Sequence, residues 1–296
     1  MKQRFVPYPD EIRVSDSRRR FAVVIRTPFL PFFGEELSGP DPYEEIVRMK
    51  GRLLKHEKRT EIQVREEADK GFFLKHYFYS GFSKWKTCFS RMPKSQREYL
   101  ALGYLKSLGI PAVEPAGCGA RRDGLGRVER CFIITAKENH ASDFRAWLRQ
   151  METKAQFQAR AAVILRSLAG FLRAIHERGF FLLRPNTRNV LIRQPDSPVP
   201  EVLFLDQPYA RFLSGPAARW GQLKDLSTLL GGALRHLDES VLSDFFDVYL
   251  PDPLGGAPEV FHDHLKLAIR ARESEHRMKK LFLQTRALLP VFLDKS

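Results

Sequence analysis

A long amphipathic helix over residues 155–178 is the strongest structural signal in the chain. Apolar residues recur there at intervals of three and four, which places them on one face of a helix. They are Ala161, Ile164, Leu165, Leu168, Leu172 and Ile175. Gly179 follows, and a glycine at this position commonly ends a helix. Because such a face has to be buried against other elements, we expect a packed helical region here.

The residues before this helix predict mainly strands. Alternating segments near 60–66 and 72–79 flank the turn sequence EEADKG and predict a hairpin, and residues 111–136 predict a strand, a turn at RRDGLG and a second strand. Residues 94–110 have helical spacing instead. Tyr99, Leu102 and Leu105 share one face of that helix, which Gly109 and Pro111 end. Residues 1–46 are mixed and proline-rich and are interpreted as an N-terminal extension.

The residues around and after the long helix are mostly helical. The segment NHASDFRAWLRQ predicts a short helix with Ser142 as its N-cap, and the pattern from 219 to the end is helical. Two short strands are expected at Val190–Arg193 and Val202–Leu205. The sequence thus predicts an α+β fold of two lobes with a cleft between them: a strand-rich lobe over 47–138 and a helical lobe over 139–296.

Composition limits the class of protein. The 296 residues are 43% hydrophobic and 28% charged, which is typical of a globular protein with a core. The formal net charge of +14 favours anionic partners, such as nucleic acid, an anionic membrane surface or a phosphorylated substrate. Basic runs such as SRRRF at 17–21 are scattered, and most are interpreted as solvated surface.

Cysteines and the first residues indicate the compartment. Cys88, Cys118 and Cys131 are few and lack metal-ligand spacing, which argues for a reducing compartment and against disulfides or zinc. The start, MKQRFVPYPDEIRV, has no apolar stretch typical of a secretory signal. The apolar segment 21–33 is too short to span a bilayer, although it could lie on a membrane surface.

Four polar residues stand at the ends of predicted elements. Lys75 lies at the end of the apolar run FFLK, Glu98 on the helix that follows, Asn189 at the end of a loop and Asp206 after the run VLFL. Each alone has an ordinary interpretation as a solvated, turn or capping residue. Together they provide one cation and hard oxygen ligands, which is what nucleotide phosphates and magnesium require.

The spacing of residues in the loop 179–189 is similar to that of a known motif. Kinase loops commonly read G-x-x-H-R-D-L-x-x-x-N before an apolar strand, and residues 179–189 have the same spacing. With FFLKHY around Lys75, the segment 94–115 and KDLSTLL around Asp225, the chain resembles the bacterial lipopolysaccharide core kinases, the heptose and Kdo kinase family. The resemblance covers roughly 50–290.

The resemblance implies a protein-kinase-like fold, ATP with magnesium as cofactors, an anionic sugar-lipid acceptor and a cytoplasmic location at the inner membrane face. It also implies roles for individual residues. Lys75, paired with Glu98, would hold the nucleotide phosphates, Asn189 and Asp206 would hold the metal, and Asp225 would support the loop.

Two loop positions depart from the family pattern. Leu182 stands where the motif has histidine, and Arg184 stands where it has the aspartate that accepts the acceptor hydroxyl's proton. Arginine stays protonated at physiological pH and cannot do this. General-base catalysis typically contributes 10²–10⁴ in rate, roughly 3–5 kcal/mol. Gln207-Pro208 also replaces Phe-Gly after Asp206, and no convincing glycine-rich loop precedes Lys75.

Three interpretations of Arg184 are open. It binds phosphate as a bidentate cation, it pairs with an acidic group such as Asp206 or Asp225, or the loop is displaced and the base comes from elsewhere. His176 and Glu177 are nearby candidates for a base, but both are expected at the helix end or surface.

The favoured hypothesis is a pseudokinase that keeps part of a Mg-ATP site. The first alternative is an active kinase of a lipopolysaccharide core sugar or another anionic acceptor. The second alternative is a basic nucleic-acid-binding protein, which only the charge supports, since no known binding motif can be placed.

Overall fold

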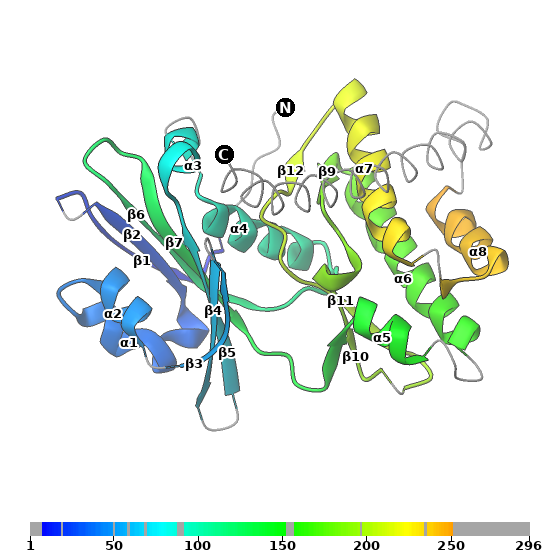
Figure 1. The fold of residues 1–296 in the computed structure, drawn as a ribbon, viewed down its shortest axis with the longest axis horizontal. Coiled ribbons are helices and arrows are strands. Elements are labelled where there is room, and N and C mark those ends of the chain that lie inside the picture. Colours follow the sequence, from blue (N-terminus) through cyan, green and yellow to red (C-terminus); the bar gives the residue numbers. More distant parts are fainter. Residues whose placement is uncertain are drawn as a thin grey trace, which may run out of the picture. The chain divides into compact units, whose positions relative to one another are not determined.

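The chain forms two compact units in the computed structural model (Figure 1). Residues 1–144 and 189–212 make up the first unit, and residues 145–188 and 213–296 the second. The structure describes residues 8–18, 20–49, 51–57, 60–67, 70–87, 92–151, 157–195, 197–233 and 236–250.

An antiparallel sheet of seven strands, in the order β1-β2-β6-β7-β5-β4-β3, is the centre of the first unit. The strands are β1 (Glu11–Asp16), β2 (Phe21–Arg26), β3 (Arg52–Glu57), β4 (Thr60–Glu67), β5 (Lys70–Phe78), β6 (Pro115–Arg122) and β7 (Val128–Ala136). The predicted hairpin is confirmed as β4–β5, with Thr60 opposite Tyr77, and the predicted strand–turn–strand unit is confirmed as β6–β7.

Strand β5 contributes side chains to both faces of this sheet, because successive side chains of a strand point to opposite sides. Phe72 and His76 contact aromatic residues of the helices on one face, Phe33 and Tyr43 respectively. Lys75 lies one residue out of step with them and points to the other face. Alternation along β5 therefore separates an apolar core from a polar site.

The first of these faces is covered by η1 (Thr27–Phe29), α1 (Leu30–Ser38) and α2 (Pro42–Arg48). The sequence predicts an extension over 1–46, but the structure places β1 and β2 in the sheet and α1 and α2 on it. Phe21, Val23 and Ile25 alternate inward and are buried. Three prolines of this segment, Pro28, Pro31 and Pro42, stand in the first turns of η1, α1 and α2, where proline is favoured.

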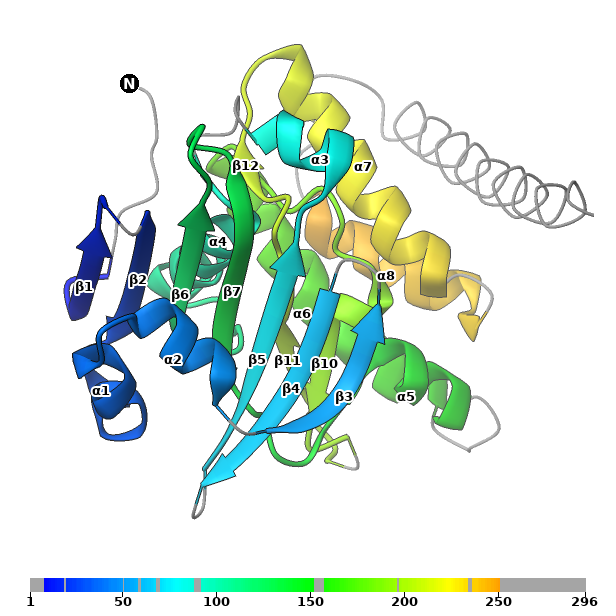
Figure 2. The same cartoon turned by 60° about the vertical axis from the view of Figure 1, so that its left-hand side comes forward.

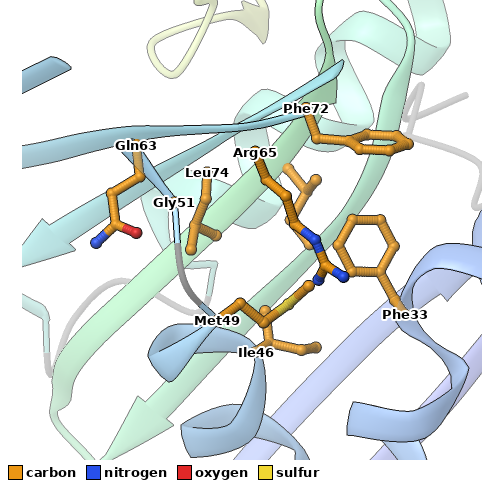
Figure 3. Close-up of a pocket in the computed structure, with 9 residues that line it drawn as sticks. Phe33, Ile46, Met49, Gly51, Gln63, Arg65, Phe72 and Leu74 are labelled. Atoms are coloured by element: carbon orange, nitrogen blue, oxygen red, sulfur yellow. The ribbon is translucent and has the colours of Figure 1, made fainter. Parts of the chain in front are cut away.

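A small apolar pocket lies between these helices and the sheet (Figure 3). Phe33, Ile46, Met49 and Leu74 line it, and Arg65 beside it forms an ion pair with Glu36 at 3.4 Å. Because Leu74 and Lys75 are neighbours on β5, the pocket and Lys75 lie on opposite faces of the sheet.

Helix α4 (Lys94–Ser107) packs on β6 and β7, and the short helix α3 (Gly81–Lys86) follows β5. Tyr99, Leu102 and Leu105 of α4 are buried, as their spacing predicts. Gly109 follows the helix with a φ of +71°, a conformation that suits glycine. The predicted helix and its end are thus confirmed.

The first unit also contains a three-stranded antiparallel sheet in the order β11-β10-β8. Its strands are β8 (Ala141–Asp143), β10 (Val190–Arg193) and β11 (Glu201–Phe204), with η3 (Thr187–Asn189) before β10 and β12 (Arg211–Phe212) after β11. The two predicted short strands are confirmed. Ser142 as a helix N-cap is wrong, because Ser142 lies in β8 opposite Ile192, and strand pairing takes up the residues before the helix.

The second unit is mainly helical. Its elements are α5 (Phe144–Met151), α6 (Phe157–Glu177), β9 (Phe180–Phe181), α7 (Pro216–Ala233) and α8 (Glu239–Tyr249). The predicted apolar face of α6 is fully buried, and α6 packs against α8. Gly179 follows with a φ of +68°. The helical prediction beyond Leu250 lies outside the described residues, and within those residues no helix has the length and apolarity to cross a bilayer.

The position of α2 in the core gives a stability prediction. Ile46 on α2 is fully buried, whereas Ile12 on β1 is 39% exposed. We expect Ile46→Ala to lower the free energy of unfolding by about 2–5 kcal/mol, because it removes apolar burial and leaves a cavity. Ile12→Ala should cost less than about 1 kcal/mol. Urea unfolding measures both, and equal small losses would mean that α2 does not belong to the core.

Candidate active site

Lys75 and Glu98 meet on one face of the large sheet. Their Nζ and Oε1 atoms are 3.7 Å apart, and Glu98, in the second turn of α4, is 2% exposed. The same ammonium group is 2.5 Å from Oδ1 of Asp206, which follows β11. Three elements distant in sequence thus place one cation between two carboxylates.

The surroundings of Glu98 change its acidity. Burial raises the pKa of Glu98 to about 7, and this outweighs the opposite effect of Lys75, while the negative charge of Asp206 adds to the rise. The Tyr77 hydroxyl donates a hydrogen bond of 2.6 Å to Oε2 of Glu98. Burial lowers the pKa of Lys75, but the two carboxylates more than offset this and raise it above its ordinary value. Lys75 is therefore a permanent cation.

Asp206 has an unusual backbone, with a φ of +57°. Few residues other than glycine adopt this conformation, and it persists where neighbouring contacts enforce it, often at functional sites. Asn189 provides such contacts. Its Nδ2 donates to the Asp206 carbonyl at 3.0 Å, and its own carbonyl accepts the Leu205 N–H at 2.9 Å. All four predicted residues, Lys75, Glu98, Asn189 and Asp206, therefore belong to the first unit.

The segment after Asp206 is tied to α4. Arg97 donates to the Pro208 carbonyl at 3.4 Å, and the ammonium group of Lys94 lies 5.5 Å from the centre of the Tyr209 ring. Gln207 is 1% exposed and donates to the Leu205 carbonyl at 2.8 Å. Sequence reasoning missed Tyr77, Arg97 and Gln207. The alternation of β5 would have found Tyr77, two residues from Lys75 and on the same face.

The loop of residues 179–188 is organised within the second unit. Asp225 on α7 is completely buried, and its carboxylate accepts backbone N–H groups from Leu182, at 2.8 Å, and from Leu183. Leu183 has a φ of +63°, a strained value for a leucine. Two charge-assisted hydrogen bonds from one carboxylate hold the strained loop in place.

His176 lies at the helix end, in the last turn of α6, as predicted, but it is not on the surface. It is 7% exposed, and its Nε2–H donates to Asp225 Oδ2 at 3.0 Å. Its Nδ1 is 2.7 Å from the Tyr249 hydroxyl. His176 is adjacent to Ile175 of the apolar face, and this places it inward. Glu177 is on the surface as expected, 2.8 Å from Arg173.

Arg184 follows two buried leucines and is itself exposed. Its carbonyl accepts the N–H of Asn186 at 2.8 Å, and Asn186 Oδ1 accepts the N–H of Arg188 at 3.0 Å, which makes a compact turn. The residue offers five N–H donors and no group that accepts a proton. Among the residues that the structure describes, no cluster of three His, Cys, Asp or Glu side chains could hold a metal ion.

Comparison with known proteins supports the kinase interpretation. A family model described as "Lipopolysaccharide kinase (Kdo/WaaP) family" matches residues 57–246. A solved structure titled "WaaP in complex with acyl carrier protein" aligns with a TM-score of 0.65 and 18% identity over 85% of this chain and 98% of that chain. A double mutant of the PknI kinase domain from Mycobacterium tuberculosis aligns with a TM-score of 0.43 and 15% identity over 74% and 94% of the two chains. No curated protein matches the sequence. The predicted kinase-like fold and family resemblance are confirmed.

The raised pKa of Glu98 predicts a pH dependence. The folded protein binds this proton more tightly than the unfolded chain, so the contribution of Glu98 to stability falls as pH rises from 4.5 to about 7. Relative to Glu98→Gln, the wild type should lose up to about 3 kcal/mol of unfolding free energy across this window. Urea unfolding of both proteins at several pH values measures the difference. A constant difference would contradict the raised pKa.

The contact between His176 and Tyr249 predicts a difference between two Tyr→Phe variants. Tyr249→Phe removes the hydroxyl next to a buried imidazole nitrogen, so it should lower the free energy of unfolding by about 1–3 kcal/mol. Tyr43→Phe is the matched control, because the buried Tyr43 hydroxyl has no hydrogen-bond partner among the described residues. That variant should be neutral or slightly stabilising. Equal losses in urea unfolding would show that the contact to His176 contributes nothing.

Proposed function

The chain belongs to the lipopolysaccharide kinase (Kdo/WaaP) family, and from this premise we propose that it is a pseudokinase of the family. It keeps part of a Mg-ATP site, binds the nucleotide weakly or not at all, and transfers little or no phosphate. One observation carries the proposal. Lys75, Glu98 and Asp206 form the expected ion cluster, while Arg184 stands at the position of the catalytic base.

The residues present fit a magnesium nucleotide. Asp206 and Asn189 offer a carboxylate and an amide oxygen, hard ligands that suit magnesium, which commonly takes its remaining ligands from phosphates and water. Lys75 would hold a phosphate and Glu98 would orient Lys75. Bound ATP would supply the transferable phosphoryl group.

The same contacts support weak binding. Lys75 lies 2.5 Å from Asp206, so a cation on this carboxylate must compete with the ammonium group. Opening a partly buried ion pair has a cost, because each charge loses its partner before the ligand replaces it. A nucleotide would therefore bind with only part of the interaction energy that its contacts provide.

Arg184 supports the loss of catalysis. The backbone before it is held by Asp225, so the loop keeps its support but has no proton acceptor at residue 184. The guanidinium group is suited to bidentate contact with a phosphate, either of the nucleotide or of another ligand. We assign it that role in preference to a purely structural one.

For the acceptor side we propose an anionic sugar-lipid at the cytoplasmic face of the inner membrane, with peripheral attachment. The net charge of +14 supports an anionic ligand. The matched WaaP structure contains an acyl carrier protein, and a carrier protein of this class is the partner to test first. Nucleic acid is not favoured as a ligand, because the net positive charge is the only feature that supports it.

An active kinase remains the alternative that a specific observation favours. The paired Lys75 and Glu98 and the loop held by Asp225 are the arrangement that an active phosphotransferase needs. Under this alternative the base comes from a group other than residue 184.

Calorimetric titration with ATP, with and without magnesium, tests the proposal. We expect weak binding that needs magnesium and is lost in Asp206→Asn. Asparagine suits the variant because it tolerates a positive φ. Asp247→Ala, which changes an exposed carboxylate on α8, is the control and should bind like the wild type.

Assays of phosphate transfer complete the test. The pseudokinase should transfer little or no phosphate to lipopolysaccharide sugars, and Arg184→Asp should raise the rate by restoring a proton acceptor. Robust phosphorylation by the wild type that disappears in Asp206→Asn would instead establish the active kinase.

A further inference from the structure

Three segments outside the Lys75 cluster meet at one end of the large sheet. They are the β1–β2 turn, the β6–β7 turn and helix α3, and Figure 2 shows them together at the upper end of the strands. The first contains the basic run SRRRF, and the second contains the turn RRDGLGR. The nucleotide site uses none of these residues.

Hydrogen bonds join the three segments into one surface. The Arg122 N–H donates to the Arg20 carbonyl at 2.8 Å, which ties the two turns together. The Arg20 side chain lies against Gly124, where an added Cβ would come within 2.9 Å of its Nη1. On the other side, the Val128 N–H donates to Thr87 Oγ1, directly after α3, at 2.9 Å.

The β6–β7 turn is ordered around Asp123. Its carboxylate accepts the Leu125 N–H at 2.9 Å, the Arg127 N–H at 3.0 Å and the Arg127 Nε–H at 2.7 Å. Gly126 completes the turn with a φ of +74°, which suits a glycine. The turn is thus built to hold one conformation, and in that conformation Leu125 is 73% exposed.

A second large apolar side chain lies beside this turn. Trp85 of α3 is 57% exposed, and the Arg127 guanidinium lies 5.8 Å from the centre of its ring. Lys84 anchors α3 to the turn through ion pairs of 3.1 Å with Asp123 and 3.4 Å with Glu129. A rigid support therefore presents a tryptophan and a leucine to the solvent.

Cations exceed acids around these two apolar residues. Among the described residues of the three segments, the cationic side chains are Arg18, Arg20, Lys84, Arg121, Arg122 and Arg127, and the acidic ones are Asp16, Asp123 and Glu129. Arg121 forms an ion pair with Asp41 of the first unit. Asp123 and Glu129 already bind Lys84 or Arg127. Arg18 and Arg20 are exposed and leave the surface with a positive edge.

We propose that this sheet-end surface, formed by Arg18, Arg20, Trp85, Leu125 and Arg127, docks the protein on an anionic lipid bilayer. Tryptophan favours the interface between headgroups and acyl chains, and a leucine on a projecting turn can enter the acyl layer. Nearby arginines attract anionic headgroups. A nucleic acid would contact the arginines but would not bury the exposed leucine side chain in an apolar environment. The contacts that hold this surface together involve no residue of the nucleotide site.

Vesicle flotation tests the surface with the full chain. Vesicles of phosphatidylethanolamine and phosphatidylglycerol should bind the wild type, and neutral phosphatidylcholine vesicles should bind it much less. Trp85→Ser with Leu125→Ser should weaken binding about tenfold or more, because both apolar anchors are lost. Trp220→Ser with Val199→Ser is the matched control, since these residues are 53% and 70% exposed elsewhere in the chain.

The outcomes separate clearly. The control variant should bind vesicles like the wild type, and added salt should weaken binding because the attraction is partly electrostatic. Both variants should unfold in urea like the wild type. Equal vesicle binding by all three proteins would overturn the proposal. So would a wild type that binds duplex DNA or an acidic carrier protein through Trp85 and Leu125 but does not bind vesicles.

Tryptophan fluorescence gives a second readout. The chain has three tryptophans, and Trp147 is 1% exposed, so Trp85 is the exposed tryptophan that remains in Trp220→Phe. Its emission should shift to shorter wavelength when anionic vesicles are added, and an unchanged spectrum with bound vesicles would overturn the insertion of Trp85. Asp206→Asn should bind vesicles normally, which separates failure of this surface from failure of the nucleotide site.

Discussion

The ion cluster of Lys75, Glu98 and Asp206 is the interaction on which the first unit's site depends. Placing charges in a buried position is unfavourable unless each has a partner. Lys75 satisfies both carboxylates, and so it joins a strand, a helix and the segment after β11. The pKa of Glu98, raised to about 7 by burial, shows that the compensation is incomplete.

Backbone strain marks two positions that function would use. Asp206 and Leu183 both have positive φ values, and each is hydrogen-bonded to a residue distant in sequence. Asn189 donates to the Asp206 carbonyl, and the Asp225 carboxylate accepts the Leu183 N–H. Strain of this kind persists only where the surrounding structure enforces it. The strained backbone is kept next to Arg184, although an arginine cannot act as a base. The backbone of this loop is therefore held by Asp225 although residue 184 is an arginine.

Periodicity explains which sequence predictions held. The apolar face of α6, the hairpin β4–β5 and the strand β10 follow from patterns within each segment, and the structure reproduces them. Residues 1–46 were misinterpreted because prolines suggested an irregular segment, whereas three of them, Pro28, Pro31 and Pro42, stand in the first turns of helices. Ser142 was misplaced because pairing with Ile192 overrode its preference for a helix cap. Local preference fails where a partner from elsewhere in the chain decides the conformation.

The sequence by itself determined the hairpin β4–β5, the helices α4 and α6, the family, and the spacing of the loop from Gly179 to Asn189 with an arginine in it, since these depend on residue types and short intervals. Only the tertiary structure decided that His176 supplies the imidazole beside Asp225 and that α2 closes the core. It also brought the two basic turns together with Trp85. The physical reason is that these contacts join residues far apart in the chain. Their proximity follows from burial and strand order, which no local pattern encodes.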